Sequence, residues 1–312
     1  MEKLIWIDGE LVKRQDARLN VFDHGLLYGD GVFEGIRQYN ERVFREQDHL
    51  QRLMDSAHAI RLNVPYTSEQ ISQAMAKTLQ ANGLKDSYIR LLITRGIGPL
   101  GVSPVGCKQP SMIIIADAIE LYPAELYHSG MAIIIAKTIR TPSAALPARV
   151  KSLNYLNNIM AKWEAIEAGV SEAVMRNHKG FICECTAVNI FIVKNGELLT
   201  PPDDSDILLG ITRAVVIELA QVAGIKVRKQ NITPEDLLAA DECFLTGTGA
   251  EVVPVTSVDK QKIGGGKVGP VTQQLMEAFH QYARETEART SKNSGSGAQV
   301  PPVHQDILRR RC

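Results

Sequence analysis

Hydrophobic and polar residues alternate in short stretches through the first part of the chain. The segment IWIDGELV predicts a hairpin that turns at Asp8 and Gly9, and GVFEGIRQYNERVFR predicts a second hairpin that turns at Asn40 and Glu41. Asparagine, aspartate and glycine accept the backbone angles that short hairpin turns need. Further strand-like runs follow at 87–95, 111–119 and 131–139.

Apolar residues at helical spacing separate these strands. Leu50, Leu53, Ala57 and Ile60 predict a helix over 46–62, and a similar pattern predicts one over 68–82 with Ser68 as its N-cap. In the second half the pattern predicts helices over 153–168, 211–223, in TPEDLL and over 270–286, and strands near 171–176, 181–185 and 188–193. Strands and helices therefore interleave in a mixed α/β pattern.

The same pattern divides the chain into parts. We expect a small N-terminal α/β domain over 1–120, a link over 121–130 around ELYPAELYHSG, and a larger domain over 131–286. The tail over 287–312 is rich in serine, glycine and proline and poor in apolar residues. Such a composition does not bury enough apolar surface to fold, so we expect a disordered tail.

Charge and composition exclude several functional classes. The 35 acidic and 35 basic residues balance, so no net field attracts nucleic acid or a membrane surface. The longest apolar runs, MIIIA and MAIIIA, are far too short to span a bilayer. Five cysteines at irregular spacing form neither a disulfide framework nor a zinc motif. We expect a cytoplasmic protein without a metal.

Two glycine-rich segments resemble nucleotide-binding loops only in their letters. GIGPLG, from Gly96 to Gly101, follows a predicted strand, but Pro99 and Pro104 bracket it and no helical period follows. A dinucleotide site needs a helix that opens within the loop. GGGKVG near 264 lacks the spacing of a phosphate-binding P-loop. Both segments are predicted to be ordinary loops.

The segment RVKSLNYLNN over 149–158 places Lys151 where a helix is expected to begin, with Tyr155 four residues later. The partial positive charge of a helix N-terminus disfavours an ammonium group. The neutral amine that it favours is a nucleophile toward carbonyl carbons. Taken by itself, however, a lysine is more often simply solvated.

Three other features gain meaning beside this lysine. Glu184 lies between apolar neighbours in FICECTA, where a carboxylate needs a cation or a donor, although by itself an exposed edge-strand glutamate is the simpler interpretation. The helix start in LLGITR and the turn TGTGAE both offer backbone N–H groups and hydroxyls to an anion, although each by itself is more often a simple helix cap or a simple turn. An amine, a phenol, a carboxylate and two anion cradles together match pyridoxal 5'-phosphate.

Seven blocks of the sequence occur in the order and spacing of the fold-type IV aminotransferases, and most resemble the branched-chain amino acid aminotransferases. The resemblance covers about residues 3–285, and the blocks are YGDGVFEGIRQY, HLQRLMDSA, YIRLLITRG, KSLNYLNNIMAKWEA, GFICECTAVNIFIVKNGELLTPP, LLGITR and TGTGAEVVPV. It implies an N-terminal α/β domain, a β-rich C-terminal pseudobarrel domain and a homodimer.

The resemblance also implies roles for individual residues. Lys151 would form the Schiff base and move the proton, Tyr155 would meet the phenolic oxygen of the cofactor, and Glu184 would pair with the ring nitrogen. The residues implied to hold the phosphate or pack on the ring are Arg52, Leu208, Ile211, Thr212 and Thr248. Those implied to contact the substrate are Tyr28, Phe33, Gly35, Arg37, Tyr88, Arg90, Gly249 and Ala250.

The implied reaction is a ping-pong transfer of the amine of leucine, isoleucine or valine to 2-oxoglutarate. One departure from the commonest family pattern lies in ECTAVN, where Cys185 and Val188 are bulkier than the usual residues and would narrow the space behind the ring. Three alternatives stay open: a D-amino-acid aminotransferase, an aminodeoxychorismate lyase, and a non-catalytic binding module. Tyr155 argues against the first, and retention of Lys151 and Glu184 argues against the last.

Overall fold

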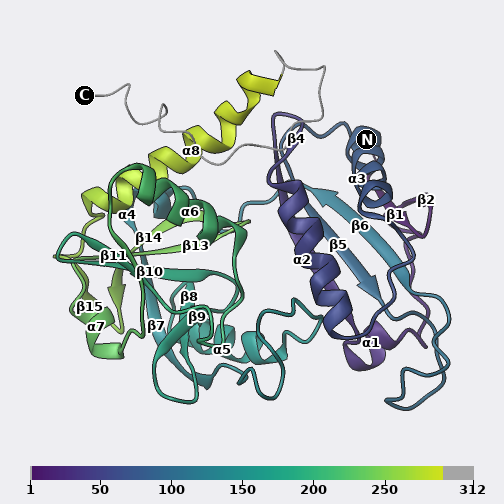
Figure 1. The fold of residues 1–312 in the computed structure, drawn as a ribbon, viewed down its shortest axis with the longest axis horizontal. Coiled ribbons are helices and arrows are strands. Elements are labelled where there is room, and N and C mark those ends of the chain that lie inside the picture. Colours follow the sequence, from purple (N-terminus) through teal and green to yellow (C-terminus); the bar gives the residue numbers. More distant parts are fainter. Residues whose placement is uncertain (1, 291–312) are drawn as a thin grey trace. The chain divides into compact units, whose positions relative to one another are not determined.

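The computed structural model describes residues 2–290, and these fall into two compact units (Figure 1). The first contains Met1–Ile119 and Arg149–Tyr155, and the second contains Glu120–Ala148 and the chain from Leu156 onward. The segment Arg149–Tyr155, which the sequence pattern placed in the second domain, thus belongs to the first unit by its contacts. Most of the tail expected over 287–312 lies outside the described residues.

The first unit is built on a six-stranded antiparallel sheet in the order β2-β1-β6-β5-β3-β4. Both predicted hairpins are present. The strands are β1 (Leu4–Ile7), β2 (Glu10–Lys13), β3 (Gly31–Tyr39), β4 (Arg42–Val43), β5 (Ser87–Thr94) and β6 (Ser111–Asp117).

Helices α2 (Glu46–Ala59) and α3 (Ser68–Asn82) pack on this sheet, and the short α1 (His24–Tyr28) precedes β3 (Figure 1). Leu50 and Leu53 of α2 are buried in one core with Ile36 of β3 and Ile89 of β5. The N-cap of α3 is Thr67 and not Ser68: its hydroxyl accepts from the backbone of Gln70, whose side chain accepts in return from the backbone of Thr67. This capping box satisfies two donors, one more than an N-cap hydroxyl alone.

The second unit contains a nine-stranded sheet that closes on itself. Strand β9 pairs with both β8 and β10, so β10, β13, β14, β7, β8 and β9 complete a ring, which confirms the predicted pseudobarrel. The strands are β7 (Met131–Ile139), β8 (Glu172–Arg176), β9 (Ile182–Cys185), β10 (Asn189–Lys194), β11 (Glu197–Thr200), β12 (Val227–Lys229), β13 (Glu242–Gly247), β14 (Glu251–Val258) and β15 (Gln261–Lys262).

Within the described residues, this unit has five helices. They are α4 (Glu125–Ser129), α5 (Leu156–Glu167), α6 (Ile211–Val222), α7 (Pro234–Leu238) and α8 (Pro270–Thr290). Helix α5 begins at Leu156, three residues later than its apolar pattern predicts. Lys151 therefore lies outside its first turn, and the effect of a helix dipole falls off within that turn. The dipole argument for Lys151 is wrong.

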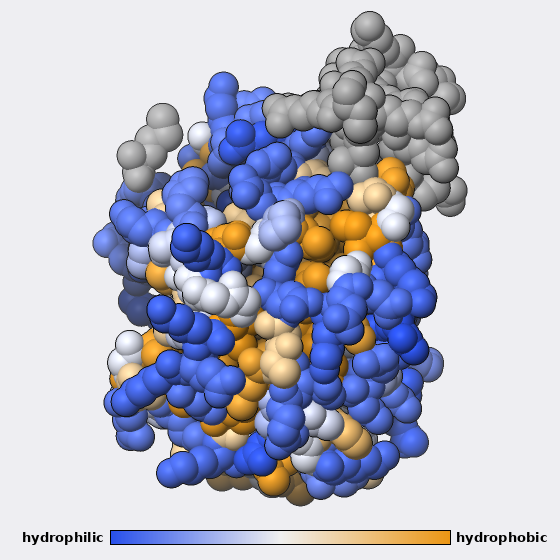
Figure 2. All heavy atoms as spheres, turned by 90° about the vertical axis from the view of Figure 1, so that its left-hand side faces the viewer, coloured by the Kyte–Doolittle hydropathy of each residue, from blue (hydrophilic) through white to orange (hydrophobic). Residues whose placement is uncertain are grey.

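Hydrophilic residues cover most of the surface visible in Figure 2, and apolar residues reach it in several places. Some of the exposed apolar side chains of the molecule belong to α5, where Leu156, Ile159, Met160, Trp163 and Ile166 are each at least half exposed. Their spacing places them along one stripe of the helix, and we call this set the α5 stripe. No helix among the described residues is long and apolar enough to cross a membrane.

Candidate active site

The segment that carries Lys151 pairs with β3 through a single antiparallel bridge between Val32 and Ser152. Phe33 donates its backbone N–H to the carbonyl of Lys151 at 3.0 Å, and Leu153 donates to the carbonyl of Gly31 at 3.0 Å. The backbone N–H of Lys151 donates to the hydroxyl of Ser56 on α2 at 3.1 Å. Both polar groups of the Lys151 backbone are therefore held, which fixes the point from which its side chain extends.

The side chain of Lys151 lies between two aromatic rings. Its Nζ donates to the Tyr155 hydroxyl at 3.1 Å and lies 4.5 Å from the centre of the Phe33 ring. The rings of Phe33 and Tyr155 meet edge to face at 5.0 Å. The structure thus brings together Lys151 and Tyr155, as the sequence predicted, although the connecting chain is not helical.

Several predicted substrate residues share one face of the same sheet. Phe33, Gly35 and Arg37 alternate along β3, and Arg90 and Tyr88 of β5 lie opposite Gly35 and Arg37. The Arg90 guanidinium lies 4.6 Å from the centre of the Phe33 ring and donates to the Tyr88 hydroxyl at 3.2 Å. The Arg90 guanidinium and the Lys151 amine thus both lie against the apolar ring of Phe33.

Glycine is needed at position 35 because the Tyr88 side chain crosses over it. A Cβ added to Gly35 would lie 1.9 Å from the Tyr88 hydroxyl oxygen. Tyr28 and Arg37 have further contacts of their own within the first unit. Tyr28 ends α1 and accepts the backbone N–H of Gly101 at 2.7 Å, and the Arg37 guanidinium lies 5.2 Å from the centre of the Tyr39 ring.

Arg52, predicted to hold a phosphate, is bound to a buried carboxylate in the first unit. Its Nε and one terminal nitrogen each donate to Glu34, both at 2.7 Å, and His49 Nδ1 lies 2.8 Å from the same carboxylate. Burial opposes ionisation of Glu34, but the charge and hydrogen bonds of Arg52, aided by His49, lower its pKa to about 2. Burial lowers the pKa of His49 below its usual value, although Glu34 opposes this.

Glu184 is buried in the second unit and does not face water. One oxygen accepts from Arg140 Nε at 2.8 Å, and the other accepts from the Leu208 backbone at 2.8 Å and from Asn189 Nδ2 at 3.4 Å. Its side chain is 6% exposed. A carboxylate with a cation and two neutral donors is stabilised in its charged form.

Asn189 connects Glu184 to the start of α6. In the sheet it lies between Glu184 of β9 and Thr246 of β13. Its Nδ2 also donates to the Leu208 carbonyl at 2.9 Å, and a Cβ added to Gly210 would lie 2.1 Å from its Oδ1. Glycine at position 210 therefore allows the chain before α6 to pass close to this amide.

The two predicted anion cradles both belong to the second unit. Ile211 and Thr212 are the first residues of α6, whose N-cap Gly210 offers no side chain to the first-turn N–H groups. Thr248 and Gly249 lie in the turn between β13 and β14, followed by Ala250, whose carbonyl accepts from Tyr127 at 3.1 Å. The Thr246 hydroxyl nearby in the sequence is buried and has no hydrogen-bond partner among the described residues.

The bulkier residues of ECTAVN are part of the protein core. Cys185 and Val188 are both buried in the core cluster of the barrel, and Val188 packs against Gly247, where an added Cβ would lie 2.7 Å from its Cγ1. Cys183, Cys185, Cys243 and Cys107 are unpaired thiols. Residues 2–290 contain no group of three or more side chains suited to a metal ion.

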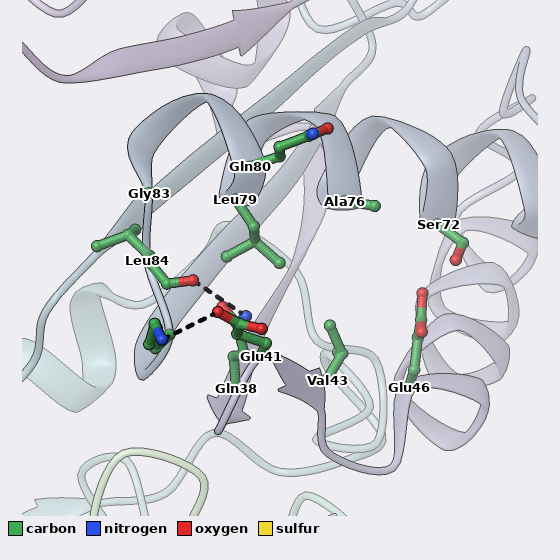
Figure 3. Close-up of a pocket in the computed structure, with 11 residues that line it drawn as sticks. Gln38, Glu41, Val43, Glu46, Ser72, Ala76, Leu79, Gln80, Gly83 and Leu84 are labelled. Carbon is green, nitrogen blue, oxygen red and sulfur yellow. Dashed lines mark hydrogen bonds and ion pairs between the residues drawn. The ribbon is translucent and has the colours of Figure 1, made fainter. Parts of the chain in front are cut away.

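A separate hollow in the first unit has a volume of about 610 Å³; the residues that line it are drawn in Figure 3. It is lined by α3 and the β3–β4 hairpin, and Glu46 and Ser72 face each other across it. Gln38 donates to the Leu84 carbonyl at 3.3 Å, and Glu41 pairs with Lys85 at 3.6 Å. No residue that the sequence predicted for the site lines this hollow.

Sequence reasoning missed Glu34, His49, Arg140 and Asn189. For Glu34 a signal existed, because a glutamate at a core-facing position of the strand VFEGI must meet a cation or be neutral. Arg140 and Asn189 carry no such signal, because their importance depends on contact with Glu184. Glu184 is 44 residues from Arg140 and 5 residues from Asn189, and only the folded sheet brings these side chains together.

Comparison with known proteins gives consistent results. A family model described as amino-transferase class IV matches residues 31–258. A putative branched-chain-amino-acid aminotransferase of Methanocaldococcus jannaschii is 48% identical over 88% of this chain and 94% of its own. The crystal structure of Escherichia coli branched-chain amino acid aminotransferase is similar with a TM-score of 0.88 and 37% identity, over 96% of this chain and all of that one. The branched-chain amino acid aminotransferase of Thermobaculum terrenum, crystallised in its PLP-form, gives a TM-score of 0.84 at 31% identity, over 93% and 97% of the two chains.

Proposed function

Because the chain belongs to the class IV aminotransferase family, we propose that it transfers the amine of L-leucine, L-isoleucine or L-valine to 2-oxoglutarate. The cofactor is pyridoxal 5'-phosphate. The observation that carries the proposal is the position of Lys151, whose amine lies beside Tyr155 and Phe33 on a segment held at both backbone polar groups of Lys151.

The donor set of this chain fits the cofactor. The uncapped start of α6 and the hydroxyl of Thr248 suit a phosphate, and Gly210 leaves room that a side chain would fill. Arg52 supplies a guanidinium for the same group, and Leu208 supplies an apolar contact for the ring. When bound, the cofactor supplies a ring that takes up the electrons of the bond broken at the α-carbon of the amino acid.

Lys151 has two tasks in this proposal. Its Nζ would hold the cofactor at the aldehyde carbon, and as a free amine it would move the proton at the α-carbon of the substrate. Tyr155 holds Nζ by its hydroxyl and donates to the phenolic oxygen of the cofactor. The fixed backbone of Lys151 limits how far the amine travels between these positions.

Glu184 keeps the ring nitrogen protonated. Its carboxylate is fixed by Arg140, the Leu208 backbone and Asn189, so its charge is held in place before the reaction and costs no reorganisation during it. The neutral donors leave the carboxylate anionic, which is the form that binds a protonated ring nitrogen.

The face of β3 and β5 suits both substrates. Phe33 offers an apolar wall for an aliphatic side chain, and Arg90 beside it offers a cation for the second carboxylate of glutamate. Tyr28, Gly35, Arg37 and Tyr88 complete the proposed pocket, and the backbone of Gly249 and Ala250 receives the α-carboxylate. An aliphatic side chain has no polar group of its own to pair, so discrimination among the three should be modest, about tenfold per methylene.

We also propose a homodimer in the cytoplasm. The α5 stripe exposes five large apolar side chains in one line, and such a surface suits contact with a second copy of the chain. The unpaired buried cysteines suit a reducing compartment.

A coupled assay across L- and D-amino acids with 2-oxoglutarate tests the function. We expect L-leucine, L-isoleucine and L-valine to react and D-alanine to react poorly. Faster turnover of D-alanine or D-glutamate would instead assign a D-amino-acid aminotransferase, and pyruvate release from aminodeoxychorismate would assign the lyase.

A further inference from the structure

A buried histidine beside Arg52 has no role in the function described so far. His49 and Glu34 have side chains that are 1% and 0% exposed, and Arg52 is 14% exposed. Nδ1 of His49 and two nitrogens of Arg52 all lie within 2.8 Å of the Glu34 carboxylate. Nε2 of His49 is buried and has no hydrogen-bond partner among the described residues.

The geometry determines which proton the histidine carries. Glu34 is ionised, because Arg52 binds both of its oxygens, and an ionised carboxylate only accepts hydrogen bonds. Nδ1 of His49 must therefore carry the proton that it donates. The groups facing the ring are Glu34 of β3, Arg52 of α2 and Lys151, and the two cations, together with burial, disfavour a second proton on Nε2. The ring is thus the neutral Nδ1–H form.

This arrangement fixes the plane of the Arg52 guanidinium. An arginine side chain has many rotamers, and its forked group binds an anion well only when its orientation is set beforehand. The Glu34 carboxylate binds two nitrogens of Arg52 in one plane. His49, one turn before Arg52 on α2, binds the same carboxylate. Both partners come from rigid elements, β3 and α2.

We propose that Glu34 and His49 are positioning residues that orient Arg52 for the phosphate of the cofactor. The proposal rests on the proposed function, in which Arg52 binds that phosphate. A purely structural role for the same three residues would stabilise the first unit without any preference for a phosphorylated ligand.

The test compares affinity for pyridoxal 5'-phosphate with affinity for pyridoxal, which lacks the phosphate, by equilibrium dialysis on the full-length protein. For His49→Leu we expect the affinity for pyridoxal 5'-phosphate to fall about tenfold, which is the effect of losing one charge-assisted contact. The affinity for pyridoxal should change little, so the preference for the phosphorylated compound should fall by the same factor. His49→Asn keeps a donor near the position of Nδ1 and should restore most of the preference. His58→Leu, an exposed histidine of the same helix, is the matched control and should change neither affinity.

Glu34→Gln and His49→Gln provide further variants if the leucine variant does not fold, and both should lose the preference. Thermal unfolding checks that each variant is folded. An equal loss of affinity for both compounds, or an unchanged preference in all variants, would overturn the positioning role. A wild-type protein that binds neither compound would overturn the proposed function and this role with it, whereas variants that keep the wild-type preference would overturn the positioning role alone.

Discussion

Single residues decide the charge of the proposed site. Glu184 and Glu34 are both buried carboxylates that bind an arginine, but they differ in their remaining partners. Glu184 accepts from neutral donors that leave its charge available to a ligand, whereas Glu34 is held by Arg52 and His49. Glu184 was singled out by its apolar neighbours together with the family resemblance, whereas Glu34 was missed although it lies at a core-facing position of its strand, because its partner Arg52 is 18 residues away on another element.

Replacing Glu184 should damage turnover more than binding. In Glu184→Gln the neutral amide cannot keep the ring nitrogen protonated, and stabilisation is lost mainly in the transition state. We expect kcat for L-leucine to fall by about a hundredfold or more, with a smaller change in KM. Steady-state kinetics of both half-reactions measures this, and an unchanged kcat with a raised KM would leave Glu184 a structural role only.

Lys151 should be essential for turnover. Lys151→Ala removes the amine that we propose to bind the cofactor and move the proton, so we expect activity to fall below detection and the visible absorbance of the covalently bound cofactor to disappear. Tyr155→Phe, which removes only the hydroxyl beside Nζ, is the milder comparison. A Lys151→Ala protein that turns over at close to the wild-type rate would refute the assignment.

The lowered pKa of Glu34 predicts a specific loss of stability in acid. The pKa falls from 4.5 to about 2 on folding, so the stabilisation is complete above pH 4.5 and is lost as the pH falls toward 2. The difference corresponds to about 3 kcal/mol in the free energy of unfolding. Urea unfolding at several pH values should show this steeper acid loss in the wild type and a flatter one in Glu34→Gln. Equal slopes in the two proteins would contradict it.

Helices and strands position these residues, and where each element begins or ends was harder to predict than whether it forms. The periodic pattern predicted most helices and strands of both units, because apolar spacing reports directly on the buried face. It failed at the start of α5, since residues 153–155 fit the helical pattern but the chain there pairs with β3 through Leu153 instead. Tertiary pairing overrode local propensity there, and no pattern within the segment could reveal the partner strand.

The start of α6 gives a prediction at this scale. Gly210→Ala would place a Cβ 2.1 Å from Asn189 Oδ1, so the amide must move and the first turn of α6 must shift with it. We expect affinity for pyridoxal 5'-phosphate to fall about tenfold or more, as dialysis would measure. In a protein that already carries Asn189→Ala, Gly210→Ala should reduce the affinity for pyridoxal 5'-phosphate only slightly, because the obstructing side chain is gone. Full additivity of the two changes would show that the contact is unimportant.

For the whole molecule, composition and motif order predicted the family and both structural classes of domain. They did not predict that the first unit is discontinuous, because nothing in RVKSLNY distinguishes a segment that pairs with β3 from a loop before a helix. They also did not predict the α5 stripe as a surface, since the same apolar residues would form an ordinary buried helix face if another element covered them.

The α5 stripe provides a test of assembly. Trp163→Glu places a charge in the middle of exposed apolar side chains, and we expect it to weaken self-association by about tenfold or more. Leu121→Glu changes an exposed leucine elsewhere in the same unit and should leave self-association unchanged. Sedimentation velocity over a range of concentrations measures this. A Trp163→Glu protein that stays dimeric at the lowest concentration would exclude the stripe as the contact.

The segment that carries Lys151 has a consequence for synthesis on the ribosome. The first unit cannot be completed when residue 119 emerges, because the segment that pairs with β3 follows only after the intervening residues Glu120–Ala148, from Arg149 onward. Until then the N–H of Phe33, which finally binds Lys151, lies on an open sheet edge, where strands of other chains can pair with it. A nascent chain stalled before residue 149 should therefore need chaperone protection. Once that segment is in place, the N–H of Phe33 is bound by the residue that we propose to be catalytic.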